Sequence, residues 1–570
     1  MTAPITPVAR ARQASRALTA LLPSLLVGCA IVTASNVPKP TPAKRTLAPE
    51  AHGSKFAVAT ENGDASSIAM DVLRSGGDAV DAAVAAALAL GVATPTACGI
   101  GGGGFAIVYR AKTHETFVID FREVGPAALD AAALDRRPLP DAERGHLVGV
   151  PGEIAGLHAL VTKYGKRAWR EDVMPAVNLA KNGFTFTAHV ARGSKELEKE
   201  LRTLTPSLGA RLLGPSGPLP IGTKIQRPDL AATLQKIADG GPRVFYEGPI
   251  ARAMVDAVKS AGGTLSLEDL AKYAPKTRTA IRFRVGAREV VTMPSPSAGG
   301  LMLAETLRAH ELMSAHGDWG TAETFHTIAE LRRGAIDDRF RFIGDPDITP
   351  VDAGALFSDA RLKKRLAMID PWTSHTGPEL QVDEHGTSHL SIIDAEGNAV
   401  ALTTTVNTGF GAKIVAGDTG IVMNDQIDDF GKTEAAIGKR ANIARPFAKP
   451  TSSMSPTIVL ENDLPVMVVG GSGGMRIATS VTLVSLAHLV FGLSAGDAVG
   501  WPRIHQKGSK LTVEGTLSPT VVAELAKRGE LLETAEAVNA VQLVTAARKG
   551  GVTLFTAASD PRKGGVALSE

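Results

Sequence analysis

The chain contains 570 residues, of which 44% are hydrophobic and 21% charged, as in an ordinary globular protein. This composition excludes a collagen, a coiled coil and a largely disordered chain. The formal net charge is +3, and the excess lies at Arg10, Arg12 and Arg16, so the remaining chain is electrically balanced. A balanced chain does not predict a nucleic-acid partner, which requires a basic patch.

The first 50 residues predict export and a tether. Basic residues precede a short apolar run, so that 1–28 is typical of a secretory signal and too short to span a bilayer. Leu-Val-Gly before Cys29 resembles a bacterial lipobox, although a plain signal with an incidental cysteine fits the same residues. Residues 29–50 are Pro-rich and predict an extended tether. We therefore expect a periplasmic or cell-envelope protein whose membrane attachment is a lipid on Cys29.

The first elements after the tether are expected to be helical and then extended. Residues 66–95 predict two helices separated at Gly76-Gly77, and the second is nearly apolar and therefore expected to be buried. Four glycines, Gly101–Gly104, precede a predicted hairpin over 105–121. These features indicate a mixed fold in which a buried helix lies close to a sheet.

The centre and the end of the chain differ in character. Residues 140–345 predict mainly helices, followed by a polar, exposed loop over 374–386. Alternating residues on both sides of the turn DAEGN predict a hairpin over 387–406. Residues 465–474 predict a strand that ends in glycines, and 475–492 predict a long apolar helix. The pattern indicates more β structure late in the chain.

Three familiar chemistries are disfavoured. His310-Glu311 and His316 are spaced one residue too far apart for a zinc-binding helix face, so we expect no metal site. The glycine run opens a strand and lacks a following Lys-Ser/Thr pair, so we expect neither a phosphate loop nor a nucleotide cofactor. Ser472 in Gly-Gly-Ser-Gly-Gly fits a serine-hydrolase elbow, but only Asp497 and His505 follow as partners, with too little chain for such a sheet.

A threonine nucleophile is the remaining candidate. Gly386-Thr387 stands between an exposed polar loop and a strand. If the chain were cut before Thr387, that residue would carry both a hydroxyl and an α-amine with a pKa of about 7.7–8.0, which can serve as the hydroxyl's own base. By itself a Gly-Thr pair before a strand also fits an ordinary strand start.

The context of Thr387 is more specific. Residues 387–430, from TSHLSIID to NDQIDDF, resemble the γ-glutamyltranspeptidase family. The resemblance extends in family order over about residues 54–567 through GIGGGGF, DFRE, GVPGEIAGL, PSPSAGG, SSMSPTIV, GGSGG and DPRKGG. It implies an α+β fold, the four-layer αββα sandwich of N-terminal-nucleophile hydrolases. It also implies self-cleavage between Gly386 and Thr387, which leaves residues 51–386 in a large chain and 387–570 in a small chain that together form one catalytic unit.

The resemblance also implies roles for individual residues. Thr387 would attack a γ-glutamyl amide such as glutathione and form an acyl-enzyme, which water or an amine acceptor resolves. Thr405 would orient Thr387, and the amides of Gly473 and Gly474 would form the oxyanion hole. The substrate α-carboxylate would bind Arg122, Ser452 and Ser453. The α-amine would bind Asn407, Gln426 and Asp429.

One departure from the family bears on substrate size. Residues 431–451 form a shorter segment than the family's lid loop and lack its tyrosine-bearing sequence. The resemblance therefore implies an open pocket that admits poly-γ-glutamyl chains or bulky acyl amides. Two alternatives remain open: an acylase of the same fold that acts on glutaryl amides, which have no α-amine, and a non-catalytic anchored binding protein.

Overall fold

The computed structural model describes residues 48–570 except 314–316, 379–385, 432–440 and 537–538. The predicted signal, Cys29 and almost all of the tether therefore lie outside the described residues, as does His316. The first described strand begins at Glu50, the last residue of the predicted tether. Within the described ranges, no helix combines the length and the apolar character that crossing a membrane requires.

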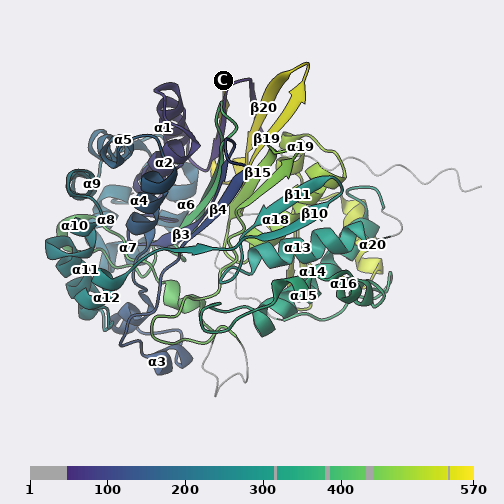
Figure 1. Ribbon diagram of the computed structural model, residues 1–570. Helices are drawn as coiled ribbons and strands as arrows, with labels where there is room; N and C mark the ends of the chain where they lie inside the picture. Colours follow the sequence, from purple (N-terminus) through teal and green to yellow (C-terminus); the bar gives the residue numbers. More distant parts are fainter. Residues whose placement is uncertain (1–47, 314–316, 379–385, 432–440, 537–538) are drawn as a thin grey trace, which may run out of the picture. The chain divides into compact units, whose positions relative to one another are not determined.

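Two seven-stranded antiparallel sheets form the centre of the described chain (Figure 1). The strands of the first sheet are, in spatial order, β1 (Glu50–Gly53), β20 (Val552–Ser559), β19 (Ala540–Lys549), β15 (Leu464–Ser472), β14 (Thr457–Glu461), β11 (Arg288–Thr292) and β10 (Ile281–Val285). Those of the second are β21 (Val566–Ser569), β2 (Ala57–Thr60), β12 (Ser388–Ile393), β13 (Ala399–Thr405), β3 (Gly103–Arg110), β4 (Glu115–Phe121) and β9 (Lys276–Arg278). The predicted hairpins 105–121 and 387–406 are thus neighbours in one sheet.

The two sheets pack face to face, and period-2 patterning explains how. In β2, Ala57 and Ala59 belong to the core shared with the first sheet, whereas Val58 belongs to the core beneath the helices. In β3, Phe105 and Ile107 alternate with Ala106 and Val108 in the same way. Because both faces are covered, these strands are apolar throughout.

Helices form the outer layers. α1 (Gly63–Arg74), α2 (Ala79–Ala93) and α4 (Glu153–Tyr164) contact the second sheet. α13 (Gly299–Glu311), α18 (Arg476–Ser485) and α19 (Ala495–Gly500) contact the first. The order helix, sheet, sheet, helix confirms the expected four-layer αββα sandwich.

Further elements surround these layers. The remaining helices are α3 (Ala131–Asp135), α5 (Trp169–Asn182), α6 (Ala188–Glu196), α7 (Glu198–Thr203), α8 (Pro206–Leu212), α9 (Pro228–Gly240), α10 (Arg243–Tyr246), α11 (Gly248–Ser260), α12 (Leu267–Lys272), α14 (Ala322–Phe342), α15 (Ala353–Leu356), α16 (Asp359–Leu366) and α20 (Pro519–Lys527). The remaining strands are β5 (Phe184–Thr185), β6 (Leu213–Gly214), β7 (Gly217–Pro218), β8 (Lys224–Ile225), β16 (Ile504–Lys507), β17 (Lys510–Glu514) and β18 (Leu531–Ala535).

The nearly apolar helix α2 is buried along its whole length, as expected. It begins at Asp78, whose side chain accepts from the amides of Val80 and Asp81 in a capping box. Gly91 allows close packing, because a Cβ there would lie 2.8 Å from the Cα of Gly99. The helix therefore anchors the glycine-rich segment that leads into β3.

Two predicted elements differ from the structure. The apolar helix after Met475 ends at Ser485 and continues as one π-helical turn, Leu486–Val490. The mainly helical centre also contains the edge strand β10 and its neighbour β11. In β10 the alternation of buried Ile, Phe and Val with exposed Arg follows the period of a strand.

Candidate active site

Thr387 stands immediately before β12 and is buried, with 5% of its surface exposed. Its Oγ1 lies 2.9 Å from Oγ1 of Thr405, at the end of the neighbouring strand β13. Its amide donates to the Ala97 carbonyl at 2.8 Å. The φ angle of Thr387 is +77°, a region that β-branched residues rarely adopt. Hydrogen bonds at the side-chain hydroxyl and at the backbone amide thus hold this threonine in a strained backbone conformation.

Gly386 occupies a place that no side chain could fill. A Cβ at this residue would lie 1.3 Å from the carbonyl oxygen of Asn407. Asn407 follows β13, and its amide donates to Thr405 Oγ1 at 2.8 Å. The peptide bond between Gly386 and Thr387 is therefore clamped against the end of β13, beside the two threonine hydroxyls.

Gly473 and Gly474 form the turn between β15 and α18. Both have positive φ angles, +114° and +58°, which glycine adopts without strain. A Cβ on Gly473 would lie 2.5 Å from the Cβ of Asn539. Among the described residues, neither amide nitrogen of this turn has a hydrogen-bond acceptor.

Arg122 lies just after β4 and is 1% exposed. Its Nη2 forms an ion pair with Asp429 Oδ2 at 2.5 Å, and the same oxygen accepts from Gln426 Nε2 at 2.7 Å. Asp429 and Gln426 belong to the 3₁₀ turn η3 (Gln426–Asp429). Burial raises the pKa of Asp429, and Arg122 opposes that rise. The structure thus brings together the residues expected to bind the substrate's carboxylate and amine, and pairs them with each other.

The Arg122 guanidinium also donates to the carbonyls of Pro450 and Thr451, the two residues that precede Ser452 and Ser453. Ser452 Oγ accepts from the Met454 amide at 3.1 Å. The Ser452 carbonyl accepts from Arg339 Nη1 at 2.7 Å. The sequence did not single out Arg339, which is a buried residue of α14.

Asn407 lies close to the same turn but in a different arrangement. Its Nδ2 donates to the Asp425 carbonyl at 3.2 Å, and its φ angle is +80°. The hydrogen bonds thus define two groups of predicted site residues: Thr387, Thr405 and Asn407 in one, and Arg122, Asp429 and Gln426 in the other. Residues 432–440 of the shortened lid segment lie outside the described residues.

Two further carboxylates, those of Glu123 and Glu153, lie on the side of the second sheet that the helices cover. Burial raises the pKa of Glu123 to about 7 and that of Glu153 to about 8. The hydroxyl of Thr404 opposes the rise at Glu153, and the negative charge of Glu123 adds to it. At neutral pH in the folded protein, Glu153 is therefore largely protonated, whereas Glu123 is about half protonated.

These shifts predict a loss of stability as the pH rises. Glu153 is protonated in the folded state up to about pH 8, whereas the unfolded chain releases this proton near pH 4.5. Its contribution is therefore fully present below pH 4.5 and is lost as the pH rises through about 8. We expect the thermal midpoint to fall between pH 5 and 8.5, with a shallower fall in Glu153→Gln. Equal slopes for the two proteins in differential scanning calorimetry would refute this assignment.

The serine-hydrolase alternative lacks its geometry. The Ser472 hydroxyl accepts from Lys563 Nζ at 2.7 Å. His505 Nδ1 instead lies 2.7 Å from Thr479 Oγ1, and burial lowers the pKa of His505 well below its usual value. Ser472 and His505 therefore do not form a Ser–His pair.

One cluster in the described chain has the composition of a metal site. Ligand atoms of His326, Glu330 and Glu530 lie within 4.8 Å of one another. However, the Arg333 guanidinium donates to both carboxylates, at 2.5 Å to Glu530 Oε2. Since a cation already neutralises the two acids, we assign no metal to this cluster.

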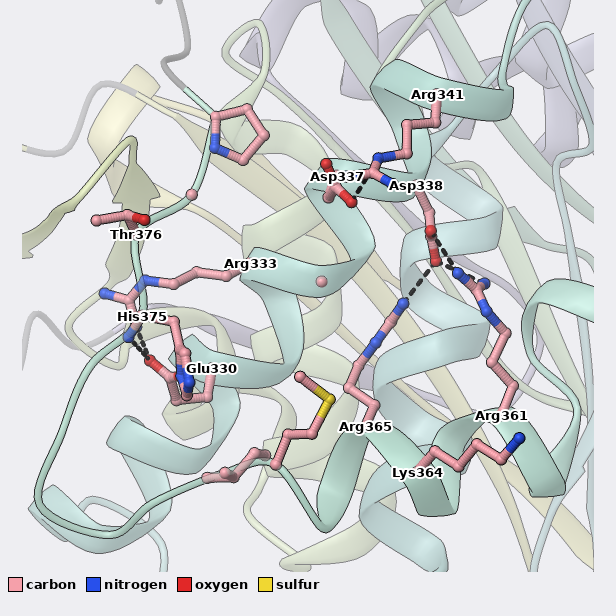
Figure 2. A pocket seen from close by; sticks show the side chains of 15 residues that line it. Glu330, Arg333, Asp337, Asp338, Arg341, Arg361, Lys364, Arg365, His375 and Thr376 are labelled. Carbon is pink, nitrogen blue, oxygen red and sulfur yellow. Dashed lines mark hydrogen bonds and ion pairs between the residues drawn. The ribbon is translucent and has the colours of Figure 1, made fainter. Parts of the chain in front are cut away.

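A cavity of about 640 Å³ lies beside this cluster, between α14 and α16. Figure 2 shows that Arg361 and Arg365 both point at Asp338, and that Arg341 points at Asp337. The arginines drawn there are thus paired with acids. The cavity is separate from the site because none of the predicted site residues lines it.

Comparisons with known proteins show to which family this chain belongs. A family model described as γ-glutamyltranspeptidase matches residues 65–569. The chain belongs to the γ-glutamyltranspeptidase family. The expected family and the expected enzyme class, γ-glutamyltransferase, are confirmed. The glutathione hydrolase proenzyme of Escherichia coli (strain K12) is 35% identical over 526 residues, 89% of this chain and 90% of that protein. That of Bacillus subtilis (strain 168) is 32% identical over 97% of each chain.

Solved structures agree on the fold. The cephalosporin acylase from Bacillus halodurans is similar over 95% of this chain and 99% of its own, with a TM-score of 0.83 and 24% identity. At that identity the likeness supports the sandwich and not the substrate. The γ-glutamyltranspeptidase of Helicobacter pylori is 34% identical over 55% of this chain and 91% of its own, with a TM-score of 0.51.

Proposed function

We propose that this member of the family is an exported, self-processing γ-glutamyl amide hydrolase and transferase whose nucleophile is Thr387. The observation that carries the proposal is the 2.9 Å contact between Thr387 Oγ1 and Thr405 Oγ1, directly beside the clamped Gly386–Thr387 bond. Lipid attachment at Cys29 and residence in the periplasm or cell envelope belong to the same proposal and rest on the sequence alone.

Processing begins with attack of the Thr387 hydroxyl on the Gly386 carbonyl carbon. The C–N bond to Thr387 breaks, the Gly386 acyl group moves from nitrogen to oxygen, and the nitrogen takes up the hydroxyl proton. Water then hydrolyses the ester, giving a large chain that ends at Gly386 and a small chain that begins at Thr387. The strained φ angle of Thr387 favours this step, because breaking the bond removes the constraint.

Turnover repeats the chemistry on an external amide. The freed α-amine of Thr387 accepts the hydroxyl proton as Oγ1 attacks the γ-carbonyl carbon, and the N–H groups of Gly473 and Gly474 stabilise the oxyanion. The amine then returns the proton to the leaving nitrogen, and an acyl ester on Thr387 results. Water or an acceptor amine attacks this ester and frees the nucleophile.

The paired charges of Arg122 and Asp429 can recognise the free end of a γ-glutamyl group. A γ-glutamyl group carries an α-carboxylate and an α-ammonium on one carbon, which match Arg122 and Asp429 respectively. Entry of the substrate exchanges the Arg122–Asp429 pair for two substrate ion pairs, while Gln426, Asn407, Ser452 and Ser453 provide further polar contacts. Glutathione and related γ-glutamyl compounds fit this requirement.

The intact mass of the purified protein tests the proposal directly. Two chains that separate between Gly386 and Thr387 are expected. A single uncut chain without turnover would refute the proposal and favour the non-catalytic binding protein.

A glutaryl acylase is the second candidate, and the shared fold of the cephalosporin acylase favours considering it. Glutaryl lacks the α-amine, so it would leave Asp429 without its partner. We expect γ-glutamyl-p-nitroanilide to exceed glutaryl-p-nitroanilide in kcat/KM by about 100-fold or more, as for a lost buried charge contact. Initial rates on the two anilides distinguish the two candidates. A kcat/KM for the glutaryl anilide that equals or exceeds that for the γ-glutamyl anilide would assign the enzyme to the acylases.

A further inference from the structure

Lys563 is a buried lysine beside the backbone of the proposed nucleophile. It ends the short 3₁₀ turn η5 (Pro561–Lys563) after β20, within the motif DPRKGG. Its Nζ donates to Ser472 Oγ at 2.7 Å and to the Thr387 carbonyl oxygen at 3.4 Å. One ammonium group thus contacts both Thr387 and the residue that precedes Gly473-Gly474.

Glu61 completes the arrangement from the opposite side. It lies between β2 and α1, and its Oε2 is 3.6 Å from Lys563 Nζ. Its Oε1 accepts from the amide of His389 at 3.1 Å. Burial lowers the pKa of Lys563 and Glu61 opposes that effect. A buried ammonium is strongly unfavourable unless it is paired, so the Glu61 carboxylate stabilises the cation in this place.

The contacts of this ion pair fall on the first residues of the small chain. Lys563 contacts the carbonyl of Thr387, and Glu61 contacts the amide of His389. Before cleavage, the peptide bond from Gly386 also fixes Thr387. Cleavage removes that restraint, so the carbonyl contact to Lys563 becomes part of what holds the new N-terminus.

We propose that Lys563 is a positioning residue that keeps Thr387 in register with the Gly473–Gly474 turn. This inference rests on the proposed function of Thr387. Its reason is geometric: the oxyanion donors directly follow β15 of one sheet and the nucleophile directly precedes β12 of the other. Lys563 joins them because it contacts both Ser472, the last residue of β15, and the Thr387 carbonyl. A displacement of about 1 Å between such groups costs roughly 100-fold in rate.

Two variants distinguish a positioning role of Lys563 from a role in packing alone. Lys563→Met removes the ammonium and keeps a similar length, and Lys563→Met/Glu61→Gln also removes the carboxylate that would be left unpaired. The matched control is Arg365→Met, which removes a cation from another buried ion pair, with Asp338. We would measure the processed fraction by intact mass, kcat and KM on γ-glutamyl-p-nitroanilide, and the thermal midpoint.

We expect the double variant to process more slowly and to lose about 10- to 100-fold in kcat, with KM within twofold, because Arg122 and Asp429 are unchanged. The control is expected to lower the midpoint and leave kcat unchanged. Blocked processing in a variant whose midpoint matches the control also supports positioning, since the same misplacement prevents attack on Gly386.

Two results would overturn the inference. The first is wild-type processing and kcat in the double variant. The second is loss of its folded transition while the control stays folded, which assigns Lys563 to stability alone. Either result, with wild-type protein cleaved and active, leaves the proposed function standing. If wild-type protein is itself uncut and inactive, the proposed function fails instead.

Discussion

Thr387→Ala is expected to remain one uncut chain, with turnover at least about 10⁴-fold below that of the wild-type protein. The alanine has no hydroxyl to attack the Gly386 carbonyl, so neither processing nor acyl transfer can begin. Losing a catalytic nucleophile elsewhere costs on the order of 10⁶-fold in kcat. Intact mass measures the first effect, and release of p-nitroaniline from γ-glutamyl-p-nitroanilide measures the second.

Thr387→Ser is the matched control, because it keeps a hydroxyl at the same position. We expect it to process and to turn over, more slowly than threonine, since serine has more rotamer freedom. Cleavage of Thr387→Ala at Gly386 would show that another group cuts the chain, and the nucleophile would have to be sought elsewhere.

Arg122→Ala is expected to process normally and to lose about 100-fold or more in kcat/KM for γ-glutamyl-p-nitroanilide. Truncating one side of a buried, hydrogen-bonded charge pair costs about 2–5 kcal/mol or more, and about 2.7 kcal/mol corresponds to 100-fold. The same loss leaves Asp429 without its cation, so the thermal midpoint should fall as well. Steady-state kinetics on the processed protein measures the first effect.

Arg122→Lys tests the geometry of that contact. Lysine retains the charge but lacks the planar fork that binds a carboxylate bidentately. It should therefore recover only part of the lost kcat/KM. Arg282→Ala, which removes an arginine from an exposed pair with Glu289, should match wild-type kinetics. Wild-type kcat/KM in Arg122→Ala would place the substrate carboxylate elsewhere.

The local elements of this protein could be predicted because their periodicities are unambiguous. The alternation on both sides of DAEGN predicted a hairpin, and the structure has β12 and β13 there. The apolar run after Asp78 predicted a buried helix, and α2 is buried throughout. The helical tendency of the centre concealed β10 and β11, because strands of only five residues give a weak signal against many neighbouring helices.

The candidate site depended on contacts between distant residues. Arg122 and Asp429 are 307 residues apart, and the sequence assigned them separate charges of a substrate without indicating that they pair with each other. Lys563 stood in a motif that the sequence singled out, but nothing in that motif indicated a contact with Thr387, which is 176 residues away. Arg339 gave no signal because arginines are frequent on helices.

The sequence by itself determined the family, the candidate nucleophile and the residue types that its chemistry requires. Side-chain chemistry and short-range periodicity follow directly from the order of the residues. The tertiary structure decided which of these groups meet. Register between β12 and β13 places Thr405 beside Thr387, and the stacking of two sheets lets Lys563 contact both Ser472 and the Thr387 carbonyl. Such pairings follow from how whole layers pack, and no local pattern encodes them.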